Sequence, residues 1–223
     1  MTKATPAPTA AGVIADLAPL ADPARAPAMR AYMRDQFEFL GIPTPARRAA
    51  LKPLIAALRG ATANELLALA GALWDLPQRE YQYAALDILA ARWKTLGAEQ
   101  LPALIALARR KSWWDSVDAT ASIIGDVLRG GHDGMDEALR DEDFWVRRIA
   151  LLHQLGWRDA VDAPRLFRYA LALSHEKEFF IQKAIGWALR DYARHAPDAV
   201  GNFLAQHRAQ LAPLSYREAA KHL

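Results

Sequence analysis

The sequence of 223 residues predicts an all-α protein. No stretch alternates polar and apolar residues over a strand length, and Val and Ile are sparse beside Ala and Leu. Apolar residues instead recur at helical spacing, and helix start signals are spread along the whole chain. Apolar residues make up 52% of the chain, which is enough for a sizeable core.

The expected helix boundaries follow from these start signals, in chain order. Thr44 followed by Pro45 predicts an N-cap at Thr44 with proline at the first helical position. Three capping boxes, in which Ser or Thr precedes an acidic residue by three positions, predict further starts at residues 62–65, 112–115 and 215–218. Proline also marks boundaries at positions 77, 102, 164 and 197. We expect about twelve helices joined by short turns.

Several of these helices begin with an aromatic residue close to a charged one. The aromatics Tyr81, Trp114, Trp145 and Phe180 are separated by 33, 31 and 35 residues. A period in the low thirties, with two helices in each period, predicts an α-solenoid of HEAT-like antiparallel helix pairs with a long concave surface. A single globular helical bundle is the alternative. We expect a disordered tail over residues 1–10 and a single domain over residues 11–223.

Composition narrows the possible functions. The chain has no cysteine, which excludes disulfides and thiolate zinc sites and fits a reducing, cytoplasmic setting. No run of 18 apolar residues is present, so a membrane span is not expected. The formal charge of +3 permits a polyanionic partner. The six histidines form no H-E-x-x-H pattern, no phosphate-binding glycine motif occurs, and we expect no metal and no cofactor.

The segment "KSWWDSVDATASIIG" at residues 111–125 places two tryptophans beside each other. Helical spacing puts Trp113 on an apolar stripe with Val117, and we expect it in the core. Trp114 falls on another face, one turn before Asp118, with only small residues further along that face. A large ring beside a carboxylate marks a candidate site. The alternative is that Trp114 packs on the next repeat and Asp118 is simply solvated.

Aromatic and basic residues alternate in a similar way on later helices. Phe180, Lys183 and Trp187 stand at helical spacing, Arg190 follows near the same side, and Arg148 lies at the edge of an earlier apolar stripe. Cations that meet phosphate and rings that meet sugar or base are typical of nucleic-acid binding. The alternative is that Trp187 is a core residue and that Arg148 pairs with a neighbouring carboxylate.

Four segments together resemble the DNA alkylation repair family of HEAT-like-repeat glycosylases, the AlkD type. They are "KSWWDSVD", "FWVRRIALLHQL", "FFIQKAIGWALRDYARHAP" and "LAPLSYREA", and the N-terminal "YMRDQFEFLGIPTPARR" also matches. The resemblance extends from about Tyr32 to Arg217. One departure is Pro43, where the family pattern leads us to expect a polar residue.

The resemblance implies a concave basic groove that holds duplex DNA. It implies a glycosylase that removes cationic N3- and N7-alkylpurines, such as 3-methyladenine and 7-methylguanine, from that duplex without base flipping. It implies Trp114, Asp118 and Trp187 as catalytic residues. It implies Arg148 as a DNA contact and Tyr32 as a residue beside the lesion, and we add Phe180, Lys183 and Arg190 as expected DNA contacts. The expected partner is double-stranded DNA with alkylated purines. We expect a monomer in the cytoplasm, on the nucleoid when bound to DNA.

The expected chemistry requires a single carboxylate. A cationic alkylpurine leaves as a neutral base and needs no general acid, so Asp118 has only to stabilise the sugar cation and orient water. Indole faces at Trp114 and Trp187 favour the same positive charge. Two alternatives remain at this point, a DNA-binding repair scaffold without catalysis and a HEAT-type protein-binding adaptor.

Overall fold

The computed structural model describes residues 9–223, and these form two compact units. The first unit ends at Leu96 and the second runs from Gly97 to Leu223. Within the described residues, regular structure consists of α-helices and short 3₁₀ turns, apart from one isolated bridge between Glu38 and Gln78. The all-α prediction is therefore confirmed. None of the helices in this described part is long and apolar enough to cross a membrane.

The predicted tail at residues 1–10 falls mainly on residues 1–8, which lie outside the described residues. At Thr9 the chain is already ordered, because its hydroxyl accepts a hydrogen bond from the Gly12 N–H and caps the first helix. The prediction of a single domain over residues 11–223 stays a prediction, and the two units are described separately below.

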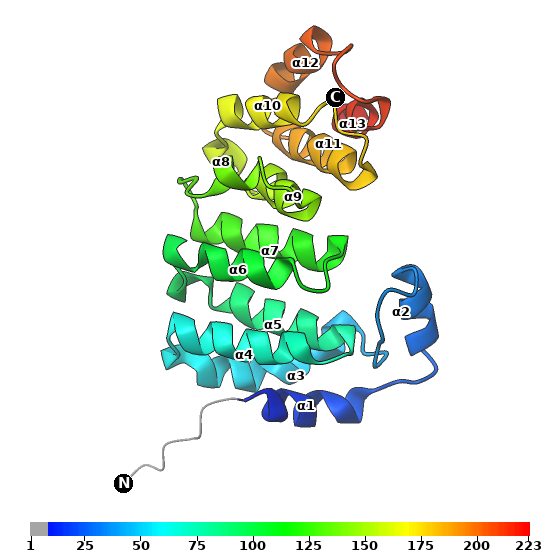
Figure 1. The fold of residues 1–223 in the computed structure, drawn as a ribbon, viewed down its shortest axis with the longest axis vertical. Helices are drawn as coiled ribbons and strands as arrows, with labels where there is room; N and C mark the ends of the chain where they lie inside the picture. Colours follow the sequence, from blue (N-terminus) through cyan, green and yellow to red (C-terminus); the bar gives the residue numbers. More distant parts are fainter. Residues whose placement is uncertain (1–8) are drawn as a thin grey trace. The chain divides into compact units, whose positions relative to one another are not determined.

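The described residues of unit 1, from Thr9 onward, form five helices. They are α1 (Ala10–Leu17), α2 (Ala26–Tyr32), α3 (Thr44–Ala57), α4 (Ala63–Asp75) and α5 (Arg79–Ala91). Helix α4 packs on α5, α5 packs on α3, and α1 packs on α3 (Figure 1). The predicted capping box of Thr62 and Glu65 is confirmed at the start of α4. The predicted N-cap at Thr44 is wrong, because Pro43 is the N-cap of α3 and Thr44 is its first helical residue. Fully buried side chains such as Leu51, Leu73 and Trp74 form the core of this unit.

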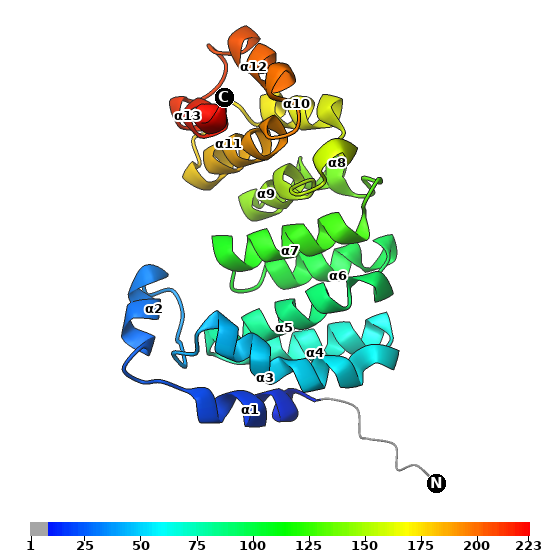
Figure 2. The ribbon, with the colours of Figure 1, turned by 180° about the vertical axis from the view of Figure 1, so that it is seen from behind.

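Unit 2 contains eight helices arranged as two rows. They are α6 (Leu101–Ala108), α7 (Trp114–Val127), α8 (Met135–Ala138), α9 (Phe144–Leu152), α10 (Ala163–Ala172), α11 (Phe179–Ala193), α12 (Pro197–Gln206) and α13 (Pro213–Ala219). In the first row α7 packs on α9, α9 on α11 and α11 on α13 (Figures 1 and 2). The second row consists of α6, α8, α10 and α12, and each of these helices packs on a helix of the first row. This stacking of helix pairs is the solenoid arrangement that the repeat spacing predicts.

Two of the predicted capping boxes are wrong. Helix α7 begins at Trp114 with Trp113 as its N-cap and no side-chain cap, and the Ser112 hydroxyl donates instead to the Ala108 carbonyl at 2.8 Å. Helix α13 begins at Pro213, which places Ser215 at the third helical position rather than at the cap. Proline in the first turn sets that start, so Glu218 is available for contacts with another helix.

The face of α7 beyond Asp118 is not open, contrary to the prediction from its small residues. Ala121 is completely buried, and a side chain at Gly125 would meet the His153 carbonyl oxygen at 2.0 Å. The small residues therefore serve close packing of α7 against the end of α9, and exposure on this face is confined to its N-terminal part. This close contact helps to bring α9 side chains onto Asp118.

Candidate functional site

The candidate site in unit 2 is built around an ion pair between Asp118 on α7 and Arg148 on α9. Arg148 Nε donates to Asp118 Oδ1 at 2.7 Å and Arg148 Nη2 donates to Asp118 Oδ2 at 2.8 Å. Such a two-bond contact fixes the plane of the carboxylate as well as its position. The Asp118 side chain keeps 22% of its surface exposed.

Arg148 is placed differently from the expectation of a direct DNA contact. Its side chain is 1% exposed, and its Nη1 donates to the Phe180 carbonyl oxygen in addition to the two bonds to Asp118. Three of its N–H groups are therefore used inside the protein. This position agrees with the alternative that Arg148 pairs with a neighbouring carboxylate, and a phosphate contact would require the guanidinium to leave it.

Burial raises the pKa of Asp118 above the ordinary aspartate value, and the hydrogen bonds and charge of Arg148 oppose that shift. The bidentate contact suits the ionised form, because both carboxylate oxygens accept from the guanidinium. Trp114, the first residue of α7, is half-buried one helical turn before Asp118. The structure therefore places the predicted pair of Trp114 and Asp118 at the same end of α7.

Trp187 on α11 is half-buried and has cations close to its ring. The Arg148 Cζ and the Lys183 Nζ each lie 5.3 Å from a ring centroid of Trp187. This is the range in which a cation is attracted to the face of an indole. Because Arg148 also binds Asp118, the three predicted residues Asp118, Arg148 and Trp187 form one connected cluster from three successive helices of the row.

Glu218 on α13 is part of this cluster, and the sequence interpretation missed it. Its Oε1 lies 2.9 Å from the Lys183 Nζ. Its Oε2 accepts from Arg190 Nη1 at 3.1 Å and from Trp187 Nε1 at 3.2 Å. The hydrogen bond and charge of Lys183 are foremost in holding the pKa of Glu218 below its ordinary value. Two cations that were expected to face DNA are thus paired inside the unit.

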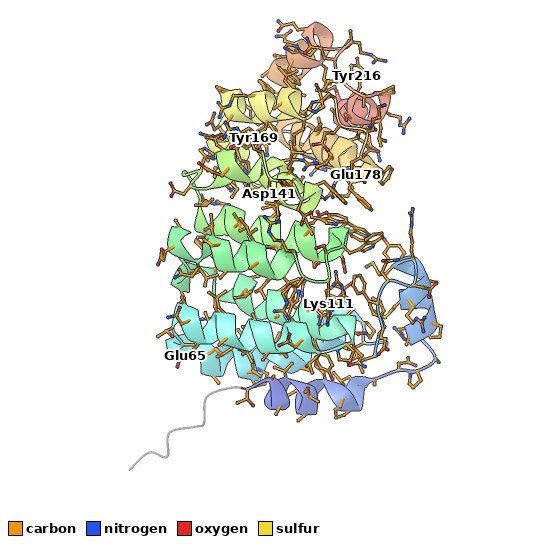
Figure 3. The ribbon with its side chains drawn as sticks, in the orientation of Figure 1. Glu65, Lys111, Asp141, Tyr169, Glu178 and Tyr216 are labelled. Carbon is orange, nitrogen blue, oxygen red and sulfur yellow. The ribbon has the colours of Figure 1, made fainter. Side chains whose placement is uncertain are left out.

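Phe180 begins an aromatic cluster at the N-terminal ends of three helices. Its ring centroid lies 5.4 Å from Trp113 and 4.8 Å from Trp145. Trp113 is half-buried in this cluster rather than in the deep core that was predicted, although Val117 on the same stripe is fully buried. Glu178, labelled in Figure 3, caps α11 by accepting from the Phe180 N–H at 3.3 Å.

Tyr32 lies in unit 1, at the end of α2, and 70% of its surface is exposed. Its expected place beside the lesion stays a prediction. The same unit has a basic surface groove between α3 and α5, which the sequence interpretation also missed. Four cations line it, namely Arg48, Lys52, Arg59 and Arg92. The carboxylate in its lining, Asp87, already accepts from Arg48 and from Arg47 at 2.9 Å each.

Comparisons with known proteins show which family this chain is similar to. A family model described as "DNA alkylation repair enzyme" matches residues 13–223. A solved structure described as a predicted DNA alkylation repair enzyme from Enterococcus faecalis is similar to this chain, with 34% sequence identity and a TM-score of 0.84. The match covers 91% of this chain and 96% of that one. No curated protein matches the chain.

Proposed function

Because the chain belongs to the DNA alkylation repair enzyme family, we propose that it is a DNA glycosylase for cationic N3- and N7-alkylated purines in duplex DNA. The observation that carries this proposal is the Asp118 carboxylate, fixed by two hydrogen bonds from Arg148 and still partly exposed. A carboxylate held in this way can face a positive charge that develops on a sugar without having to reorient.

The proposed reaction begins with a lesion that is already positively charged. Cleavage of its N-glycosidic bond moves the bonding electron pair onto the base, which leaves neutral, and the positive charge passes to the deoxyribose. Asp118 stabilises this oxocarbenium-like sugar and orients the attacking water. The Trp114 and Trp187 rings are proposed to favour the same charge through their faces.

The protonation states of Asp118 and Glu218 exclude neutral bases as substrates in this proposal. Removal of a neutral base needs either an acid that protonates it as it leaves or donors that stabilise the departing anion. Asp118 is paired with a guanidinium in a geometry suited to a carboxylate, and the lowered pKa of Glu218 keeps that second carboxyl ionised at neutral pH. Neither group is therefore suited to donate a proton at neutral pH. The positive charge must come with the lesion.

The substrate is proposed to be duplex DNA whose damaged base stays stacked. Asp118, Trp114 and Trp187 are all partly exposed on the helix row of unit 2, which suits contact with a sugar at the duplex surface. The basic groove between α3 and α5 in unit 1 is proposed to bind backbone phosphates. Its lining holds four cations and one carboxylate, Asp87, which is already paired. HEAT-like repeats, cytoplasmic location and a monomeric state belong to the same proposal.

A DNA-binding repair scaffold without catalysis is the second candidate. The pairing of Asp118 with Arg148 favours it, since a carboxylate neutralised by a buried cation has less charge to offer a sugar. One experiment separates the candidates: release of 7-methylguanine from methylated duplex DNA, corrected for spontaneous loss, beside binding of the same duplex. Release supports the glycosylase. Binding without release supports the scaffold, and absence of both supports a protein-binding adaptor.

A further inference from the structure

Glu218 joins three groups of the proposed site from a fourth helix. One carboxylate oxygen contacts the Lys183 ammonium, and the other accepts from Arg190 and from the indole N–H of Trp187. The indole N–H bond restrains rotation of the Trp187 ring. The contact with Glu218 also holds the Lys183 ammonium beside Trp187, where the Lys183 Nζ lies 5.3 Å from a ring centroid.

Close packing of α13 on α11 sets the position of Glu218. The Ser215 hydroxyl donates to the Gln182 carbonyl at 2.9 Å, and this bond ties the first turn of α13 to α11. A side chain at Gly186 would lie 2.4 Å from Glu218 Cβ and 2.9 Å from the Ser215 carbonyl oxygen. The backbones of α11 and α13 can approach this closely only because position 186 has no Cβ. The packing of these two helices therefore sets the position of the Glu218 carboxylate beside Trp187.

We propose that Glu218 is a positioning residue for base release, which fixes the Trp187 ring and pairs with both Lys183 and Arg190 beside it. The inference rests on the proposed glycosylase function. If the Trp187 ring is to receive a cationic nucleotide, an uncompensated ammonium 5.3 Å from a ring centroid would repel that nucleotide and its transition state. Glu218 reduces this repulsion because its negative charge lies against both cations.

This role predicts opposite effects on chemistry and on DNA affinity. Glu218→Gln keeps an oxygen that can accept from Trp187 Nε1 but removes the negative charge. Lys183 and Arg190 then become available to phosphates, so duplex DNA should bind more tightly and with a steeper salt dependence, by about one unit for each additional phosphate that is neutralised. Base release should slow, because the same cations are left uncompensated at the Trp187 ring. A residue that only supports the fold would weaken binding and release together.

The test uses the full-length protein and single-turnover release of 7-methylguanine at saturating protein. We expect Glu218→Gln to release base roughly tenfold more slowly, which is less than the loss of a direct electrostatic stabiliser. Affinity for undamaged duplex, titrated over a range of salt, should rise. Glu137→Gln is the matched control, since it removes the same charge from an exposed position on α8 in the same unit and should leave the release rate unchanged.

A second variant keeps the inference testable if Glu218→Gln also loses stability. Adding Lys183→Met to Glu218→Gln removes an uncompensated cation, so the double variant should release base faster than Glu218→Gln alone. A wild-type release rate in Glu218→Gln, or a parallel fall of rate and affinity that Lys183→Met does not relieve, would overturn the positioning role. Absence of release by the wild-type protein would instead refute the proposed function itself, so the two failures are distinct.

Discussion

Replacement of Arg148 by methionine tests whether this arginine acts inside the protein or on DNA. Methionine fills part of the same volume but removes the two hydrogen bonds to Asp118 and the one to the Phe180 carbonyl. Breaking a fully buried pair typically costs about 3–5 kcal/mol, because the partner charge is left without compensation. Asp118 is 22% exposed, so water can replace part of the lost contact. We therefore expect a loss of about 2–3 kcal/mol.

That loss should lower Tm by roughly 4–12 °C in a chain of this length. The pH dependence of base release should change as well. Burial raises the pKa of Asp118 and Arg148 opposes the rise, so removal of Arg148 should raise this pKa further. Release requires the ionised carboxylate, so its rate should begin to fall at a higher pH in the variant than in the wild-type protein. The salt dependence of DNA binding should stay as it is in the wild type.

Arg147→Met provides the matched control. Arg147 is on the same helix and makes a two-bond ion pair with Glu176, at 2.6 and 2.9 Å, without contacting Asp118. This variant should lose stability but keep the wild-type pH profile of base release. If Arg148→Met instead lowers the salt-dependence slope by about one unit and leaves the pH profile unchanged, Arg148 contacts a phosphate and its assignment to Asp118 is wrong.

Two further predictions concern packing and substrate range. Gly186→Ala should destabilise the chain by about 1–3 kcal/mol, because the new methyl group would meet Glu218 and Ser215. Gly201→Ala, which has open space around it, should be neutral or slightly stabilising in the same thermal melt. In a release assay on defined duplexes, 7-methylguanine, 3-methyladenine and a bulky cationic N3-adduct of adenine should be excised, and uracil and hypoxanthine should not. Efficient uracil release would require protonation or stabilisation of the departing base and would contradict the proposed reaction.

The all-α class and most helix starts could be predicted from the sequence because they depend on local signals. Helical periodicity, proline in the first turn and the capping box at Thr62 act over a few residues, and each was confirmed. The boxes at Ser112 and Ser215 were wrong because the same S-x-x-acid pattern also occurs inside a helix or before one. At Ser215 the proline two residues earlier was the stronger signal.

The pairing of side chains between helices could not be predicted from local patterns. Asp118 and Arg148 are 30 residues apart, and Lys183 and Glu218 are 35 apart, so their contact depends on how successive repeats stack. The repeat period itself carries the missing information, because residues about one period apart fall side by side on neighbouring helices. A search for opposite charges at that spacing would have found both pairs.

The face of α7 shows a related limit. Small residues at positions 121 and 125 were interpreted as an open surface, yet both are buried against neighbouring elements. Alanine and glycine on a helix face permit either an open site or close approach of another helix, and only tertiary structure distinguishes the two. Asp118 remains partly exposed because it lies near the start of α7, before this close contact begins.

Single-turnover release of 7-methylguanine by Asp118→Asn tests the central claim most directly. Asparagine keeps the shape of the side chain and removes its charge, so the rate should fall about 10²–10³-fold while duplex affinity stays within a few-fold. Asp126→Asn makes the same change on the same helix, at a residue in an exposed ion pair with Arg129, and this variant should release base at the wild-type rate. Base release by a folded Asp118→Asn protein at a rate close to that of the wild type would contradict the account.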